Sequence, residues 1–176
     1  MKNLILSFSI MLCCLLPLQV NAQSTQKLTK ADKEKIVNRV KEYCDLISTF
    51  SKDIEQIDKM EDIFNLCENS KVQTFDDIAD LTKQKSGEYH SVPLFQYLQN
   101  ITTKYENSIN ITYSDFKCER TVSEPSLGGG LEGNTYAIVH VVKTLKAKGL
   151  NKTIPLKITL NTNNFKIGGT VSETYE

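Results

Sequence analysis

The chain has 176 residues, 40% of them hydrophobic, and its 21 lysine and arginine residues balance its 21 aspartate and glutamate residues. A neutral chain of this kind has no basic surface that would recruit nucleic acid or an anionic membrane by bulk charge. Its two histidines, His90 and His140, are too few for a histidine-rich zinc site, and we predict neither a metal nor a cofactor.

Residues 1–22 have the pattern of a secretory signal peptide. A basic start is followed by the apolar run Leu4–Leu18 and by Val20-Asn21-Ala22, which has the spacing of a signal-peptidase site. We therefore expect an exported protein, periplasmic or secreted, whose mature chain begins at Gln23. After cleavage no other segment is apolar and long enough to span a membrane.

The chain has five cysteines, of which Cys13 and Cys14 lie within the signal peptide. A lipoprotein is the less favoured alternative, because neither of these two follows a small residue. The mature chain keeps Cys44, Cys67 and Cys118, so at most one internal disulfide can form. We predict that Cys44 is a buried free thiol, which leaves Cys67 and Cys118 as the pair that could form a bridge. Three buried, unreactive thiols are the other interpretation.

Apolar residues recur at helical spacings in the first half of the mature chain. Helices are expected over residues 29–51, 53–66, 74–81 and 91–105. Thr29 and Asp32 approximate a capping box at the start of the first helix, and Thr74 is expected to cap the third. Residues 23–28 form a polar arm in this interpretation, and residues 29–176 form a single domain.

After residue 107 the apolar period changes from 3.6 to 2, which predicts strands. The organising element is the run Thr135–Leu145, expected to be the central strand of an antiparallel sheet. One face would carry Ala137, Val139, Val141 and Leu145, and the other Tyr136, Ile138 and Val142. Further strands are expected over residues 109–122, 153–161 and 165–174, with a bulge near Ser114-Asp115 in the first. The fold class is therefore α+β, with N-terminal helices packed on a curved antiparallel sheet formed by the C-terminal half.

This order of elements resembles the cone-shaped nuclear-transport-factor-2-like superfamily, which is common among small exported bacterial proteins. The resemblance covers about Thr29 to Tyr175, and includes the helix opening at Ser91-Val92-Pro93 and the final Asn163-Asn164-Phe165-Lys166-Ile167-Gly168. It implies a sheet that curls around the helices and leaves a pocket. Members range from isomerases and dehydratases to binding domains without catalysis, so the resemblance does not select a function.

Few residues offer catalytic chemistry. His140 in the central strand could act as an acid or base, with Asp115 or Tyr113 on the preceding strand as its partner. The alternative is a hydrogen-bonded histidine on a covered sheet face. Residues 128–133 satisfy the dinucleotide pattern G-x-G-x-x-G, but a strand rather than a helix follows them, so we interpret them as a flexible loop.

Two functions remain. The favoured one is an exported, non-catalytic module that binds a small apolar ligand or a protein partner, with a homodimer among the options. Helices cover one face of the central strand, so Tyr136, Ile138, His140 and Val142 on the other face are the predicted ligand or interface residues. The alternative is an acid/base enzyme, similar to an isomerase or dehydratase, that uses His140 in a cone-shaped pocket.

Overall fold

The computed structural model describes residues 28–52, 58–78, 91–104, 109–123, 134–147 and 149–173 of the chain. The helices are α1 (Lys30–Lys52), α2 (Asp58–Asn65) and α3 (Leu94–Lys104). The strands are β1 (Gln73–Phe75), β2 (Ser91–Pro93), β3 (Asn110–Ser123), β4 (Thr135–Ala147), β5 (Leu150–Asn161) and β6 (Lys166–Ser172). The predicted signal peptide, almost all of the predicted arm, and the glycine-rich residues 128–133 lie outside the described residues.

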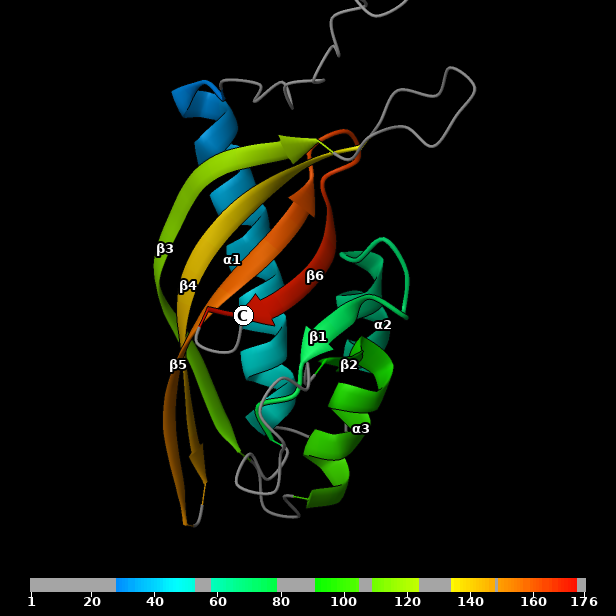
Figure 1. Cartoon of the computed structure of the whole chain (residues 1–176). Helices are drawn as coiled ribbons and strands as arrows, with labels where there is room; N and C mark the ends of the chain where they lie inside the picture. Colours follow the sequence, from blue (N-terminus) through cyan, green and yellow to red (C-terminus); the bar gives the residue numbers. More distant parts are fainter. Residues whose placement is uncertain are drawn as a thin grey trace, which may run out of the picture.

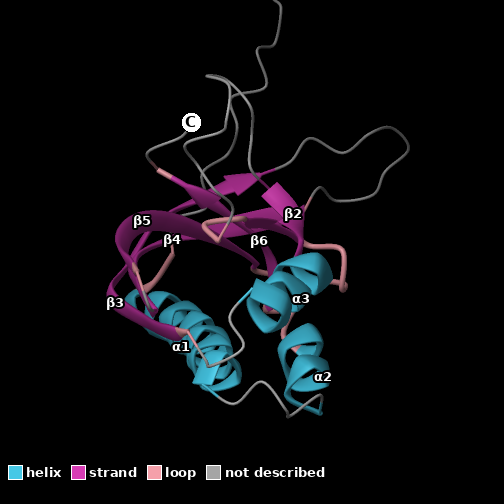
Figure 2. Cartoon of the chain, turned by 90° about the horizontal axis from the view of Figure 1, so that it is seen from below, coloured by secondary structure: helices cyan, strands magenta, loops and turns pink. Residues whose placement is uncertain are grey.

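The six strands form one sheet in the order β2-β1-β6-β5-β4-β3. Neighbouring strands are antiparallel except β1 and β6, which run parallel. The long strands of the C-terminal half curve around α1 (Figure 1), and all three helices lie on the same side of the sheet (Figure 2). The predicted α+β class, with N-terminal helices packed on a curved sheet, is therefore confirmed. The two short strands from the N-terminal half and the parallel β1–β6 pair are additions to it.

Helix α1 begins at the capping box that its sequence predicts. The Asp32 N–H donates to the Thr29 hydroxyl, and the Thr29 N–H donates to the Asp32 carboxylate, each over 3.1 Å. Hydrogen bonds from the side chain and backbone of Thr29 favour the charged carboxylate and lower the pKa of Asp32. One stripe of the helix is buried, formed by Ile36, Val40, Tyr43, Cys44, Ile47, Phe50 and Ser51.

Strand β4 lies between β3 and β5 and presents different side chains to the two faces of the sheet. On the inner face, toward the helices, the buried residues are Ala137, Val139, Val141, Lys143 and Leu145. On the outer face, the half-buried residues include Tyr136, Ile138, His140 and Val142. The alternation of the sequence predicts this division of the apolar residues. Lys143 is the unexpected member of the buried face.

Two short strands occupy segments where the sequence predicts helix. Thr74, expected to cap a helix, lies in β1, and the Phe75 N–H donates to Thr170 Oγ1 of β6 over 3.2 Å. Residues 91–93 form β2, which pairs with β1, so α3 begins at Leu94 rather than at residue 91. Pairing with another strand outweighs the local capping pattern at both places.

Strand β3 contains two irregularities in its pairing with β4. The first lies between Ser114 and Lys117, where Asp115 has a φ of 57°, and it confirms the bulge predicted at this position. The second lies between Cys118 and Arg120 and was not predicted. Glu119 is the inserted residue of this second bulge, and it contributes to the outer face described below.

Candidate functional site

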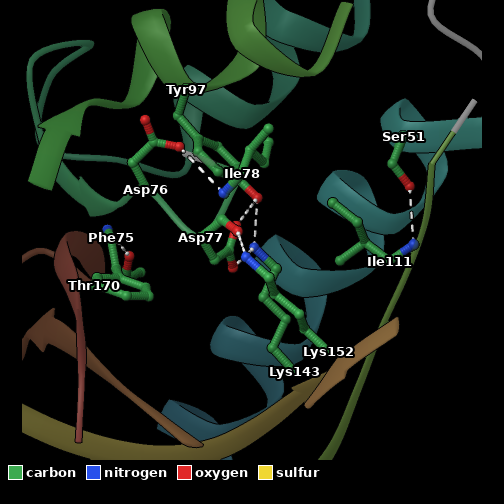
Figure 3. Close-up of polar contacts among 10 residues, drawn as sticks. All are labelled: Ser51, Phe75, Asp76, Asp77, Ile78, Tyr97, Ile111, Lys143, Lys152 and Thr170. Atoms are coloured by element: carbon green, nitrogen blue, oxygen red, sulfur yellow. Dashed lines mark hydrogen bonds and ion pairs between the residues drawn. The ribbon is translucent and has the colours of Figure 1, made fainter. Parts of the chain in front are cut away.

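A lysine and an aspartate form a buried ion pair between the inner face of the sheet and the segment that follows β1 (Figure 3). Lys143 Nζ lies 2.6 Å from Asp77 Oδ2, and the two side chains are 2% and 0% exposed. The Tyr97 hydroxyl of α3 donates to Asp77 Oδ1 over 3.0 Å and accepts from Lys143 Nζ over 2.5 Å. These three groups therefore form a closed triangle of polar contacts.

Aromatic rings and a second lysine surround the triangle. Lys143 Nζ lies 4.6 Å from the centre of the Tyr97 ring and 5.7 Å from that of Tyr113. Lys152 Nζ donates to the backbone carbonyl of Asp77 over 3.2 Å (Figure 3). Burial raises the pKa of Tyr97 and of Tyr113 well above the ordinary value. Both phenols therefore stay neutral at physiological pH, and the only charges in the triangle are those of the ion pair.

The triangle is closed to a ligand. Tyr97 is 1% exposed, and the side chains of Lys143 and Asp77 are 2% and 0% exposed. An acid–base catalyst must come within hydrogen-bond distance of the proton that it transfers. The geometry is therefore that of a buried polar connection between β4, the segment after β1, and α3, rather than that of an open catalytic centre.

His140 lies on the outer face of β4, between two carboxylates. Its Nε2 is 3.0 Å from Glu119 Oε2, and its Nδ1 is 2.5 Å from Glu173 Oε1. Both contacts are hydrogen bonds when both ring nitrogens carry a proton, as they do in the imidazolium form. A hydrogen bond from Lys117 over 3.2 Å, and then the charge of His140, lower the pKa of Glu119. The histidine is thus held as the centre of a small charged group on the sheet surface.

The structure does not bring the predicted acid–base residues together. Tyr113 pairs with Lys143 on the inner face, so the sheet itself separates its side chain from that of His140. Asp115 lies at the first bulge of β3, where its carboxylate accepts a hydrogen bond from the Ser114 hydroxyl over 2.8 Å. His140 lies on the outer face of the sheet, whereas the described helices lie on the opposite side (Figure 2).

The predicted interface residues do share one surface. Ile138 and Val142 flank His140 on β4, and all three are half-buried. At the start of the same strand, the Tyr136 hydroxyl donates to the Glu68 carboxylate over 3.2 Å. None of the described helices packs on this face of the sheet (Figure 2).

Cys44, Cys67 and Cys118, the cysteines within the described residues, are free thiols. Cys67 forms a bridge pair with Ile167 of β6, whereas Cys118 lies in β3 at the other edge of the meander. Strands β5 and β4 lie between β6 and β3, so β6 and β3 are roughly 14 Å apart at about 4.8 Å per strand. A disulfide requires Cα atoms less than about 7 Å apart. The predicted bridge between Cys67 and Cys118 is therefore not formed.

The buried pair Lys143 and Asp77 is what the sequence interpretation missed. In the sequence, Lys143 has the same parity as the four apolar residues of the inner face, and this was the available signal that it is buried. Asp77 gave no such signal, because an acidic residue three positions after Thr74 resembles a helix cap.

Within the described ranges, no group of three histidine, cysteine, aspartate or glutamate residues is arranged to hold a metal ion. No helix in these ranges is long and apolar enough to cross a membrane.

No protein-family model matches the chain, and no curated protein matches it. Among solved structures, the chain is similar to the crystal structure of a putative polyketide cyclase from Xanthomonas campestris pv. campestris, with a TM-score of 0.39 and 10% sequence identity. That alignment covers 80% of this chain and 90% of the other. The likeness is too distant to assign a family or an activity.

Proposed function

We propose that the protein is an exported, non-catalytic binding module that associates through the outer face of its sheet, with a second copy of the chain as the partner. Export is supported by the signal-peptide pattern of residues 1–22. Membership of the nuclear-transport-factor-2-like superfamily is part of the same proposal. It is supported by the order of elements and by a sheet that curves around the helices (Figure 1).

The observation that carries the proposal is the apolar strip on the outer face of β4. Tyr136, Ile138 and Val142 lie on this face and are only half-buried, and no described helix packs against them. Apolar side chains grouped on one surface are typical of an interaction site. His140, at the centre of the strip, has a carboxylate at each of its ring nitrogens, so covering the strip would not leave these nitrogens without a partner.

The charges around the strip favour a second copy as the occupant. The same face carries Lys117 and Glu119 from β3, Lys157 from β5, and Glu173 after β6. In a two-fold symmetric contact a surface meets itself, so a face that carries both signs can pair with its own copy. Val171, 44% exposed and paired with Lys157 in the sheet, extends the apolar surface toward β6.

Replacing Ile138 with Glu tests the proposal. The substitution places a charge within the apolar strip, and the dimer should weaken by at least about a hundredfold, which corresponds to roughly 3 kcal/mol. Analytical ultracentrifugation over a concentration series would measure the association of the wild type and the variant. Circular dichroism and a urea melt would establish that the monomer of the variant is still folded.

Thr153→Glu is the matched control. Thr153 is exposed and pairs with Thr144, six residues along β4 from Ile138, so the same charge lies on the same face at about 20 Å from Ile138. It should leave association almost unchanged. A wild-type chain that stays monomeric at 100 µM or so would contradict the proposal, and so would an Ile138→Glu variant that folds and associates normally. A variant that fails to fold would place Ile138 in the core of the monomer.

A further inference from the structure

A hollow lies between the first half of α1 and the turn that joins β5 to β6. This turn lies at the end of the molecule where α1 begins (Figure 1). Its volume is about 480 Å³, within the range of roughly 300–1,000 Å³ that is typical of small-molecule sites. Its lining consists of Lys35, Asn38, Arg39 and Glu42 from α1, with Asn164 and Phe165 from the turn. Asn38 and Arg39 follow Lys35 by three and four positions, and Glu42 follows them by four and three, so the four helix residues lie on one side of α1. The hollow is separate from the outer face of the sheet.

The charged lining of the hollow has an excess of positive charge. Arg39 Nη1 donates to Glu42 Oε2 over 2.7 Å, so the single acid of the lining is already engaged by one cation. Lys35 Nζ lies 5.0 Å from the centre of the Phe165 ring, a cation–π distance. The acid that interacts with its charge is Asp32, which lies outside the lining and whose pKa Lys35 helps to lower. The Arg39 guanidinium has five N–H donors, of which the contact with Glu42 uses one. The hollow therefore offers two cationic donors to an incoming acceptor.

The aromatic ring of Phe165 lines this hollow. The backbone of this residue has a conformation that few residue types adopt readily. Its φ is 56°, in the left-handed region that glycine and asparagine adopt more readily. The turn is fixed around it: the Phe165 N–H donates to the Asn161 carbonyl, and the Lys166 N–H donates to Asn164 Oδ1, each over 2.9 Å. Residues in such conformations are concentrated at ligand-binding and active sites, where the surrounding structure over-determines them.

We propose that this hollow binds a small organic anion with a flat or ring-shaped body. Its carboxylate would accept hydrogen bonds from Lys35 and Arg39, because hydrogen bonds between ionised groups are the stronger kind. Its ring would lie against Phe165, and the side-chain amides of Asn38 and Asn164 would meet polar substituents. This site is independent of the proposed dimer contact, since it lies on the helix side of the sheet.

Three probes separate the parts of this recognition. Benzoate has both the carboxylate and the ring, benzamide has the ring without the charge, and inorganic sulfate has the charge without the ring. We expect benzoate to bind in the millimolar range, as a ligand of nine heavy atoms with an ordinary efficiency per atom would. Titrations of the ¹⁵N-labelled full mature chain, followed by two-dimensional NMR, should shift the amide signals of the hollow. Benzamide and sulfate should each bind about tenfold more weakly or not at all.

Variants of the lining test the location. Lys35→Gln removes one cationic donor, and Phe165→Asn removes the ring and places a residue that accepts a positive φ. Each should weaken benzoate binding by about tenfold. Lys41→Gln is the matched control: Lys41 is also on α1, and its Nζ lies 5.6 Å from the ring of Phe116, so it loses the same kind of contact outside the hollow. Benzoate binding should survive that change.

The outcomes are decisive in both directions. The site is supported if the amide shifts caused by benzoate centre on the hollow, disappear in both lining variants and persist in Lys41→Gln. Sulfate that binds as tightly as benzoate would overturn the assignment to an organic anion. Benzoate shifts elsewhere in the molecule, or none at 20 mM or so, would overturn the site itself. The variants are at partly exposed positions, and a urea melt of each would show that the fold is intact.

Discussion

Lys143 is a charged residue on a face of β4 that is otherwise apolar and buried. Removing an ion from water is unfavourable by several kcal/mol, and the attraction of a buried partner offsets this only when the geometry is good and other hydrogen bonds are made. Asp77 at 2.6 Å and the Tyr97 hydroxyl at 2.5 Å provide both. The pair is therefore expected to be stable as a unit but sensitive to the loss of either member.

Lys143→Met should destabilise the protein by about 3–5 kcal/mol, because Asp77 would remain buried without its counter-charge. The double variant Lys143→Met with Asp77→Asn should recover much of that loss, since it removes both charges and keeps an acceptor for Tyr97. Urea unfolding of the wild type, both single variants and the double variant measures the coupling. The exposed Lys146→Met on the same strand is the control and should change stability by less than about 0.5 kcal/mol. A single variant as stable as this control would mean that the pair contributes nothing to the fold.

At the scale of the elements, Tyr136 connects β4 to more distant parts of the sheet. A Cβ added to Gly168 of β6 would lie 2.8 Å from Cε1 of the Tyr136 ring and 3.1 Å from Thr159 Oγ1 of β5. The ring therefore extends from β4 across β5 to β6, and its hydroxyl reaches Glu68 beyond. Glycine at position 168 is needed because the ring occupies the space of a side chain.

Gly168→Ala should therefore destabilise the protein by about 1–3 kcal/mol through overpacking. The ring cannot move away freely, because its hydroxyl is hydrogen-bonded to Glu68. In a Tyr136→Val background the same substitution should have little effect, so thermal unfolding of the four chains in a double-mutant cycle would show a coupling above about 1 kcal/mol. Additive effects of the two substitutions would show that the ring and residue 168 do not interact.

Long periodic elements could be predicted from the sequence, and short ones could not. Helix α1 and strands β4 and β5 each repeat their apolar pattern over many residues, and the sequence correctly predicted that they are a helix and two strands and which apolar residues share the buried face of β4. Strand β1 has three residues, too few to show alternation, and Thr74 with Asp77 matched a capping pattern instead. What makes Thr74 part of a strand is the pairing with β2 and β6, which a local pattern does not contain.

The surroundings of His140 were beyond prediction for a similar reason. Its two partners come from β3 and from the residue after β6, on opposite sides of β4 in the sheet. Glu119 reaches it from a second bulge in β3, and a bulge changes which side chains share a face. The sequence therefore predicted the face of the sheet on which His140 lies, but neither of the acids that hold it.

For the whole molecule, the three cysteines of the described residues, Cys44, Cys67 and Cys118, are expected to be reduced but unreactive. Burial raises the pKa of Cys67 to about 12 and raises those of Cys44 and Cys118 as well. Because the thiolate is the reactive form, a raised pKa leaves little of it at pH 8. Iodoacetamide should therefore modify the native protein slowly, most readily at the half-buried Cys118.

Intact-mass analysis of exported protein, alkylated in denaturant without reductant, should give a chain that begins at Gln23 and carries three alkyl groups. The same measurement tests the cleavage of the predicted signal peptide and the number of free thiols. One alkyl group would reveal an internal disulfide, whereas a mass that retains Cys13 or Cys14 with acyl chains would identify a lipoprotein instead.

The parallel pair β1–β6 also has a consequence for the order in which the chain can fold. The hydrogen bond from Phe75 to Thr170 joins positions 95 residues apart, and the contact of Glu68 with Asn161 spans 93. Ribosomes make β1, β2 and α3 before β6 exists, so these elements have no sheet to join until residues 166–172 have been synthesised. Contacts of such long separation form slowly, because chain closure must come before them. Completion of the sheet is therefore a late step that depends on the last described strand.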